Sequence, residues 1–301
     1  MSSDDDFKCG YVAIIGRPNV GKSTLLNHIL GVKLSITSRK PQTTRHQILG
    51  IKTSAHSQSI YVDTPGMHSG GKKAINRYMN KAASSVIFDV DVVLFVVQAL
   101  VWTEEDQMVL DKLKQIETPV ILVVNKVDTI KEKETLLPFL QDLSNKFNFK
   151  SVMPVSAEKG NNVKQLEESL IELLPVNPPY YDEDDFTDRS SRFLVAELIR
   201  EKLVRELGDE LPYQSTVEIE TFKEEEKLIR INAAILVETK GQKAIIIGSK
   251  GGRLKSIGTK ARKEMEKLLG QKVFLQLWVK VKAGWSDDEA ALRSLGYTND
   301  D

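Results

Sequence analysis

Apolar residues in the first half of the chain gather in short continuous runs. Continuous runs are typical of strands that are buried on both faces of a parallel sheet. Polar stretches with helical spacing separate them. The runs lie at residues 12–15, 59–62, 120–124 and 151–155, and the predicted helices at 25–30, 72–86, 104–115, 132–146 and 163–173. This alternation predicts an α/β domain on a mostly parallel sheet with helices on both faces.

The pattern changes after residue 174. Prolines and an acidic cluster follow, and they cannot continue the preceding helix, so we expect a semi-rigid linker. A helix, two strands, a long helix and a last strand come next, which predicts a smaller α+β domain. The expected boundaries are a flexible tail at 1–8, a first domain at 9–174, the linker at 175–190, a second domain at 191–285, and a C-terminal helix and tail at 286–301.

Composition is consistent with two ordinary domains, since the chain has 301 residues and 41% of them are apolar. A single cysteine, Cys9, excludes a disulfide framework or a cysteine zinc site and fits a reducing cytosol. No stretch approaches the roughly eighteen apolar residues of a membrane span, and the acidic N-terminal residues do not form a signal peptide. We therefore expect neither export nor a membrane span.

The first candidate motif follows the first apolar run. Residues 16–23 read G-x-x-x-x-G-K-S and precede a predicted helix. Glycines at both ends let backbone N–H groups face phosphate oxygens, Lys22 reaches the β and γ phosphates, and Ser23 offers its hydroxyl to magnesium. The alternative is a glycine-rich turn that binds nothing. The segments that follow argue against that alternative.

Asp63-Thr64-Pro65-Gly66 comes directly after the second run. The Asp63 carboxylate is expected at the strand's carboxyl end, facing a nucleotide crevice, where it binds magnesium through water. The Gly66 N–H can contact a γ-phosphate, and this contact disappears on hydrolysis. By itself the segment also fits an ordinary turn, so its position after a buried strand decides the interpretation.

Base selection is predicted from Asn125-Lys126-Val127-Asp128, which follows another buried run. A carboxylate at Asp128 accepts hydrogen bonds from the guanine N1–H and exocyclic amine, which adenine lacks. This predicts GTP rather than ATP. The residues expected to contact the nucleotide are Gly16, Arg17, Pro18, Asn19, Val20, Gly21, Lys22, Ser23, Thr24, Asp63, Thr64, Pro65, Gly66, Asn125, Lys126, Asp128, Ser156, Ala157 and Glu158.

Basic residues are concentrated in the second domain. Residues 240–283 hold twelve Lys or Arg and two Glu, whereas the whole chain has zero formal charge. Such segregation is an electrostatic footprint for phosphate backbones. A solvated helix face is the alternative, and for Lys260, Lys263 and Lys267 the two interpretations stand equal.

A G-x-x-G loop lies inside this basic segment. Its glycines let a nucleic-acid backbone approach closely, as in KH modules that clamp about four nucleotides of single strand. With the helix and strand order, this predicts a type II KH fold that binds RNA and not DNA. The residues expected to bind RNA are Lys243, Gly248, Ser249, Lys250, Gly251, Arg253 and Lys255.

The chain resembles the bacterial Era GTPases, which join a Ras-like P-loop G domain to a C-terminal type II KH domain. The resemblance covers nearly the whole chain and includes the motifs above. It also rests on Pro41–His46, Ile247–Gly251, Trp278–Lys282 and Trp285. It implies binding to the 3′ region of 16S ribosomal RNA, a role in maturing the small (30S) subunit, and peripheral contact with the cytoplasmic membrane.

The resemblance also implies roles for particular residues. Thr44, with Thr43 as the alternative, is the switch I hydroxyl that joins Ser23 and Asp63 on magnesium. Many GTPases place a water-orienting Gln where this chain has Met67. Members of the wider group use a potassium ion held by an asparagine, and Asn19 matches that position. The catalytic set is then Lys22, Thr44, Gly66 and Asn19, with slow intrinsic turnover.

These observations favour a monomeric cytoplasmic switch in which GTP and magnesium control RNA binding and hydrolysis resets the protein. One alternative is an RNA-binding assembly factor with little hydrolysis, against which the intact nucleotide motifs argue. A second is a tRNA-modification-type GTPase. Those enzymes have a folate or flavin partner domain and a C-terminal cysteine, neither of which is visible in this sequence.

Overall fold

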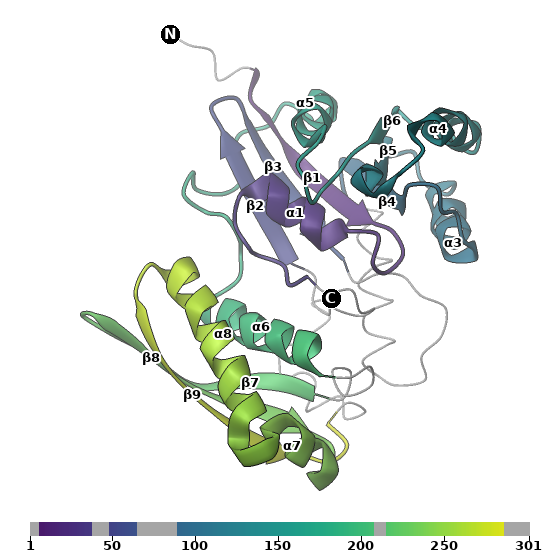
Figure 1. Ribbon diagram of the computed structural model, residues 1–301. Coiled ribbons are helices and arrows are strands. Elements are labelled where there is room, and N and C mark those ends of the chain that lie inside the picture. Colours follow the sequence, from purple (N-terminus) through teal and green to yellow (C-terminus); the bar gives the residue numbers. More distant parts are fainter. Residues whose placement is uncertain (1–5, 38–47, 65–88, 208–214, 286–301) are drawn as a thin grey trace. The chain divides into compact units, whose positions relative to one another are not determined.

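The computed structural model describes residues 6–37, 48–64, 89–207 and 215–285 (Figure 1). The described residues form two compact units. The first contains residues 6–35, 48–64 and 89–188, and the second contains residues 36–37, 189–207 and 215–285. Several predictions from sequence lie outside the described residues, namely those for the helix at 72–86, the C-terminal helix, Thr43, Thr44, Pro65, Gly66 and Met67.

The first unit is built on a six-stranded sheet with the order β2-β3-β1-β4-β5-β6. All neighbouring strands are parallel except β2 and β3, which pair antiparallel. The prediction of a mostly parallel sheet is confirmed. The strands are β1 Lys8–Ile15, β2 Ile48–Ser54, β3 Ser57–Asp63, β4 Val92–Gln98, β5 Val120–Asn125 and β6 Ser151–Pro154.

Helices cover both faces of this sheet. Successive residues of β1 are buried on opposite faces, because side chains alternate along a strand. On the face of Ala13 and Ile15, the core includes Phe95 together with residues of α3 and α4. The α4 helix begins later than predicted, since residues 133–135 form a separate 3-10 turn. The helices of this unit are α1 Lys22–Leu30, α3 Glu104–Leu113, α4 Leu136–Ser144 and α5 Val163–Leu173.

The segment that the sequence predicts as a linker is hydrogen-bonded to the first unit up to residue 187. Gln58 of β3 accepts hydrogen bonds from the backbone N–H groups of Tyr180 and Tyr181 at 2.8 and 3.0 Å. The Cys9 N–H donates to Pro175 O at 3.0 Å. The rings of Tyr11 and Tyr180 stack with centroids 5.8 Å apart. The backbone groups of this segment therefore find partners on the strands, which is why it lies along them.

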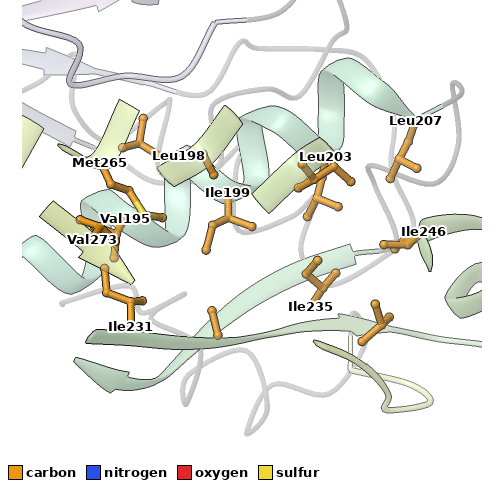
Figure 2. Close-up of a cluster of buried hydrophobic side chains, with 14 of the residues drawn as sticks. Val195, Leu198, Ile199, Leu203, Leu207, Ile231, Ile235, Ile246, Met265 and Val273 are labelled. Carbon is orange, nitrogen blue, oxygen red and sulfur yellow. The ribbon is translucent and has the colours of Figure 1, made fainter. Parts of the chain in front are cut away.

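The second unit is a three-stranded sheet, ordered β7-β8-β9, with its helices packed on one face (Figures 1 and 2). Its core joins Ile199 of α6, Ile231 and Ile235 of β8, Ile246 of α7 and Met265 of α8. The predicted type II KH fold is confirmed, but the order is helix, strand, strand, helix, helix, strand, with one helix, α7, more than the sequence predicted. The elements are α6 Ser191–Glu206, β7 Ser215–Glu225, β8 Leu228–Val237, α7 Lys240–Ile247, α8 Gly252–Leu269 and β9 Lys272–Val281.

Candidate functional site

The loop between β1 and α1 has the backbone of a phosphate-binding loop. Gly16 and Gly21 have φ angles of 146° and 105°, which residues with a Cβ rarely adopt. A Cβ at Gly16 would lie 2.3 Å from Val96 O, and one at Gly21 would lie 2.2 Å from the Asn125 amide nitrogen. The two glycines are therefore required by close packing against β4 and β5 as well as by the turn.

Lys22 lies at the start of α1 and is nearly buried, with 6% of its surface exposed. Its Nζ donates hydrogen bonds to the backbone oxygens of Gly16 and Arg17 at 2.9 and 3.0 Å. Burial lowers the pKa of its ammonium from 10.5 to about 8, although the Asp63 carboxylate opposes this shift. An anion in the loop would offer the ammonium a stronger acceptor than these carbonyls.

The phosphate loop is tied to the segment that follows β5. Asn125 donates through Nδ2 to Val20 O at 2.8 Å and accepts through Oδ1 from Ala157 N at 2.9 Å. Lys126 Nζ donates to Asn19 O at 2.6 Å and to a side chain of β4. One pair of neighbouring residues thus joins three of the predicted motifs at the carboxyl ends of the strands.

Asp128 and Ser156 meet at the outer side of this cluster. The Ser156 hydroxyl donates to Asp128 Oδ1 at 2.5 Å and accepts from Lys159 N at 3.1 Å. The Asp128 carboxylate is exposed, whereas Ser156 is buried. The serine therefore fixes one oxygen of a carboxylate that faces solvent. Glu158 is exposed in the same turn.

Asp63 and Ser23 form the third part of the site. Ser23 Oγ donates to Asp63 Oδ2 at 2.9 Å, and the next residue, Thr64, donates through Oγ1 to Ile14 O at 3.1 Å. Asp63 is fully buried, and within the described part of the chain its Oδ1 has no hydrogen-bond partner. Burial raises the pKa of Asp63, and Lys22 is the strongest opposing group. A hydroxyl beside an unpaired carboxylate oxygen is a donor set that suits Mg²⁺.

Sequence reasoning missed Ser35, whose hydroxyl also donates to Asp63 Oδ2 at 2.8 Å. No motif marks this serine, because its role depends on a contact with a residue 28 positions away. Only the fold brings the two residues together.

The glycine loop of the second unit joins α7 to α8. The helix α7 ends at Ile247, and Gly248 follows it as the C-cap residue. Lys250 and Gly251 have φ angles of 48° and 74°. Arg253 donates through Nη1 to Ile245 O at 2.6 Å, so part of its guanidinium closes the end of α7. Lys250 itself is exposed.

A groove of about 330 Å³ opens beside this loop, between α8 and β9. It combines an apolar wall with basic side chains, a composition that suits bases on one side and phosphates on the other. Gly258, which the sequence did not single out, keeps the groove open, because a Cβ there would lie 3.2 Å from Leu277 Cδ1. The lining residues are Gly251, Leu254, Lys255, Gly258, Thr259, Arg262, Leu275 and Leu277.

The fold and these loops define a class: a P-loop GTPase domain followed by a KH domain. Comparisons with known families agree. Residues 11–126 match a family model described as 50S ribosome-binding GTPase, and residues 210–286 match a KH domain model.

Relatives that match over nearly the whole length identify one family within this class. The chain is 62% identical over 290 residues to GTPase Era of Pseudomonas aeruginosa, covering 96% of this chain and 95% of that protein. It is 60% identical over 297 residues to GTPase Era of Pseudomonas fluorescens, covering 99% of each. The chain belongs to the Era family of GTPases, which bind and hydrolyse GTP.

Solved structures show the same fold over the same length. One is Aquifex aeolicus Era, as a variant bound to GDP and aluminium fluoride. Another is an Era in complex with MgGDPNP and nucleotides 1506–1542 of 16S ribosomal RNA. For each, the TM-score is 0.93, the identity 38%, and the match covers 97% of this chain and 100% of the other. Among the described helices, none is both long and apolar enough to cross a bilayer.

Proposed function

We propose that this protein is a GTP-dependent switch that binds the 3′ region of 16S ribosomal RNA through its KH groove and acts in maturation of the 30S subunit. The observation that carries the proposal is the groove beside the Gly248–Gly251 loop, in a chain that also has a complete set of guanine-nucleotide loops. An Era of the same fold is bound to this RNA. The family description that mentions the 50S subunit belongs to a model that covers only residues 11–126.

Guanine recognition is assigned to Asp128. Ser156 occupies one carboxylate oxygen from the side and so orients the group. The bonds from Asn125 to Val20 and Ala157 hold this region in register with the phosphate loop. The Ala157 N–H donates to Asn125 Oδ1 and so shapes the loop that approaches the base. This N–H is therefore not free to donate to the base.

Magnesium is the cation proposed for the site, held by Ser23 and Asp63. The unpaired Asp63 Oδ1 and the adjacent hydroxyl are the observations that fit it. When bound, the ion neutralises phosphate charge that develops as the γ-phosphoryl group leaves. Thr44, the proposed third ligand, and Gly66 lie outside the described residues.

We assign hydrolysis to the positioning of the phosphates and to the positive charge beside them, rather than to a side chain that acts as a general base. Lys22 holds the phosphate oxygens through its ammonium. Asn19 has a φ of 64° and its backbone oxygen is bound by Lys126, so its place in the loop is fixed. We propose that its side-chain amide helps to hold a potassium ion, and that turnover is slow without RNA or another activator.

RNA binding is assigned to the groove and the glycine loop together. Leu275 and Leu277 form an apolar wall, and Lys255 and Arg262 supply positive charge. Exposed Lys250 extends this charge along the loop. About four unpaired nucleotides fit such a clamp. We place the protein in the cytoplasm as a monomer, where the same basic face can also contact an anionic membrane surface.

The test is binding of the full chain to a 16S 3′ fragment, with a non-hydrolysable GTP analogue or with GDP. Lys250→Glu should abolish binding, and Lys131→Glu, an exposed lysine of the first unit, is the matched control. Tighter binding with the GTP analogue supports a nucleotide-controlled clamp. Equal affinity in both nucleotide states contradicts the switch, and absence of binding contradicts the RNA target.

A further inference from the structure

One oxygen of the Asp63 carboxylate accepts hydrogen bonds from two hydroxyl groups. Ser23 Oγ and Ser35 Oγ lie 2.9 and 2.8 Å from Asp63 Oδ2. Asp63 and Ser35 are both fully buried. The other oxygen, Oδ1, has no partner among the described residues. The two serines therefore select which carboxylate oxygen is left for another ligand.

Ser35 is itself held by an amide clasp from α1. Asn27 Oδ1 accepts from the backbone N–H groups of Ser35 and Leu34 at 2.8 and 3.0 Å. Asn27 Nδ2 donates to Ser35 O at 2.6 Å. Asn27 follows Ser23 by four residues, so both lie on the same face of α1. Through this clasp, the helix that begins at the phosphate loop fixes the backbone of Ser35.

The two hydroxyls differ in what else they must do. Ser23 is the residue that offers its oxygen to a magnesium ion in a loop of this type. Ser35 has no such second task, and its single O–H is directed at Asp63. Loss of Ser35 would leave the carboxylate with Ser23 alone and free to turn about its last side-chain bond, which is a soft torsion.

We propose that Ser35 is a positioning residue for Asp63, and that Asn27 and Ser35 together set the affinity of the site for Mg²⁺. This inference rests on the proposed magnesium site. Groups that hydrogen-bond to a metal-binding residue typically contribute about 10-fold to 100-fold to metal affinity. Through this clasp, Ser35 supports the Mg²⁺ site, although Ser35 itself contacts neither nucleotide nor metal.

The experiment measures release of a fluorescent GDP analogue over a titration of free Mg²⁺. In Ser35→Ala, the Mg²⁺ concentration that half-maximally slows release should rise by about tenfold, and the release rate in excess chelator should not change. Asn27→Ala should shift the midpoint in the same direction. Ser35→Thr keeps the hydroxyl and should restore the wild-type midpoint.

The matched control is Ser57→Ala. Ser57 is also buried and its hydroxyl is hydrogen-bonded to Ser54 at 2.8 Å, but it lies at the other end of β3 from Asp63. That distance is about 20 Å along the strand. Thermal unfolding of each variant shows whether it is folded at the assay temperature.

Three results would overturn the inference. One is a Mg²⁺ midpoint in Ser35→Ala equal to that of Ser57→Ala. Another is faster release in chelator by the same factor as in Mg²⁺, which would indicate a merely structural role. The third is a shift in folded Ser35→Thr as large as in the alanine variant. If GDP release from the wild type does not depend on Mg²⁺, the proposed magnesium site itself is wrong.

Discussion

Arg17 Nε lies 3.0 Å from Asp106 Oδ2, so an ion pair joins the phosphate loop to the first turn of α3. Asp106 is fully buried and also forms a capping box with Thr103, accepting from its N–H and its hydroxyl. Sequence analysis placed Arg17 only among residues that contact the nucleotide. The structure adds a partner for its guanidinium 89 residues away, and the predicted nucleotide contact stays a prediction.

Arg17→Ala should therefore destabilise the first unit. Removing one partner of a buried pair leaves an uncompensated charge, at a cost of about 3 kcal/mol in the free energy of unfolding. Urea unfolding measures this cost. Lys114→Ala is the control, because Lys114 pairs with Asp111 on the same helix at an exposed position, and it should have little effect. Equal stabilities of the two variants would contradict the assigned role of Arg17.

Asp128→Asn should change the base that the site accepts. An amide can accept from N1–H but must donate where the carboxylate accepts, so it fits xanthine, which has a carbonyl in place of the guanine amine. Loss of charge-assisted bonds should weaken GDP binding by about 100-fold, and XDP should gain affinity. Competition for a fluorescent nucleotide measures both changes. Asp142→Asn, at an exposed position on α4, should leave both affinities unchanged; failure of XDP to gain argues against the assignment.

Nucleotide binding should become linked to proton uptake as the pH rises through the pKa of Lys22, about 8 in this structure. Phosphate oxygens stabilise the ammonium, so a chain that binds nucleotide above this pH takes up a proton. Calorimetry in two buffers of different ionisation enthalpy should show uptake at about pH 8.5 and none at about pH 6.5. Lys22→Met should bind weakly and without the linkage. Equal proton uptake at both pH values would contradict it.

The same group affects stability with a definite sign. The pKa of Lys22 is lower in the folded chain than in the unfolded chain, so between about pH 8 and about pH 10.5 the unfolded state binds more protons. The Lys22 contribution to the free energy of unfolding should therefore rise with pH across that window in the nucleotide-free protein. Comparison of wild type with Lys22→Met by urea unfolding isolates this contribution.

Gly258→Leu should block the KH groove without unfolding the second unit. Gly258 lies inside α8, where leucine is the better helix former by roughly 1 kcal/mol, and its side chain would enter the space beside Leu277. RNA affinity should fall by at least about tenfold, with nucleotide affinity unchanged. Gly241→Leu on α7 is the control, since that position is exposed. Unchanged RNA binding in Gly258→Leu would show that the groove is not the binding surface.

The parts of the site that sequence predicts best are those whose chemistry requires a fixed residue at a fixed distance from a strand. Lys22, Asp63 and Asn125 are of this kind, and the structure brings them together at one edge of the sheet. Arg17 with Asp106, and Asn27 with Ser35, could not be predicted in this way. Each contact depends on the folded positions of distant or irregular segments, and an arginine or serine in a loop carries no periodic signal.

The strands also include features that the sequence predicts and features that it does not. The apolar run at 120–124 predicted the central strand β5 well, because both faces of this strand are covered. The strand β4, which is equally buried, was not among the predicted runs. Polar Gln58 lies within β3 and is fully buried, which apolar patterning does not predict. The Gln58 amide satisfies the backbone of residues 180 and 181. Its Oε1 accepts from both N–H groups, and its Nε2 donates to the oxygen of residue 181.

The two hydrogen bonds of Asn125 couple the two ends of the proposed nucleotide site. One amide supports both the phosphate loop, through Val20, and the segment of the proposed base site, through Ala157. Substitution of Asn125 would therefore release both segments at once. In the proposed site, a single change far from any phosphate would disturb the contacts to the phosphates and to the base together.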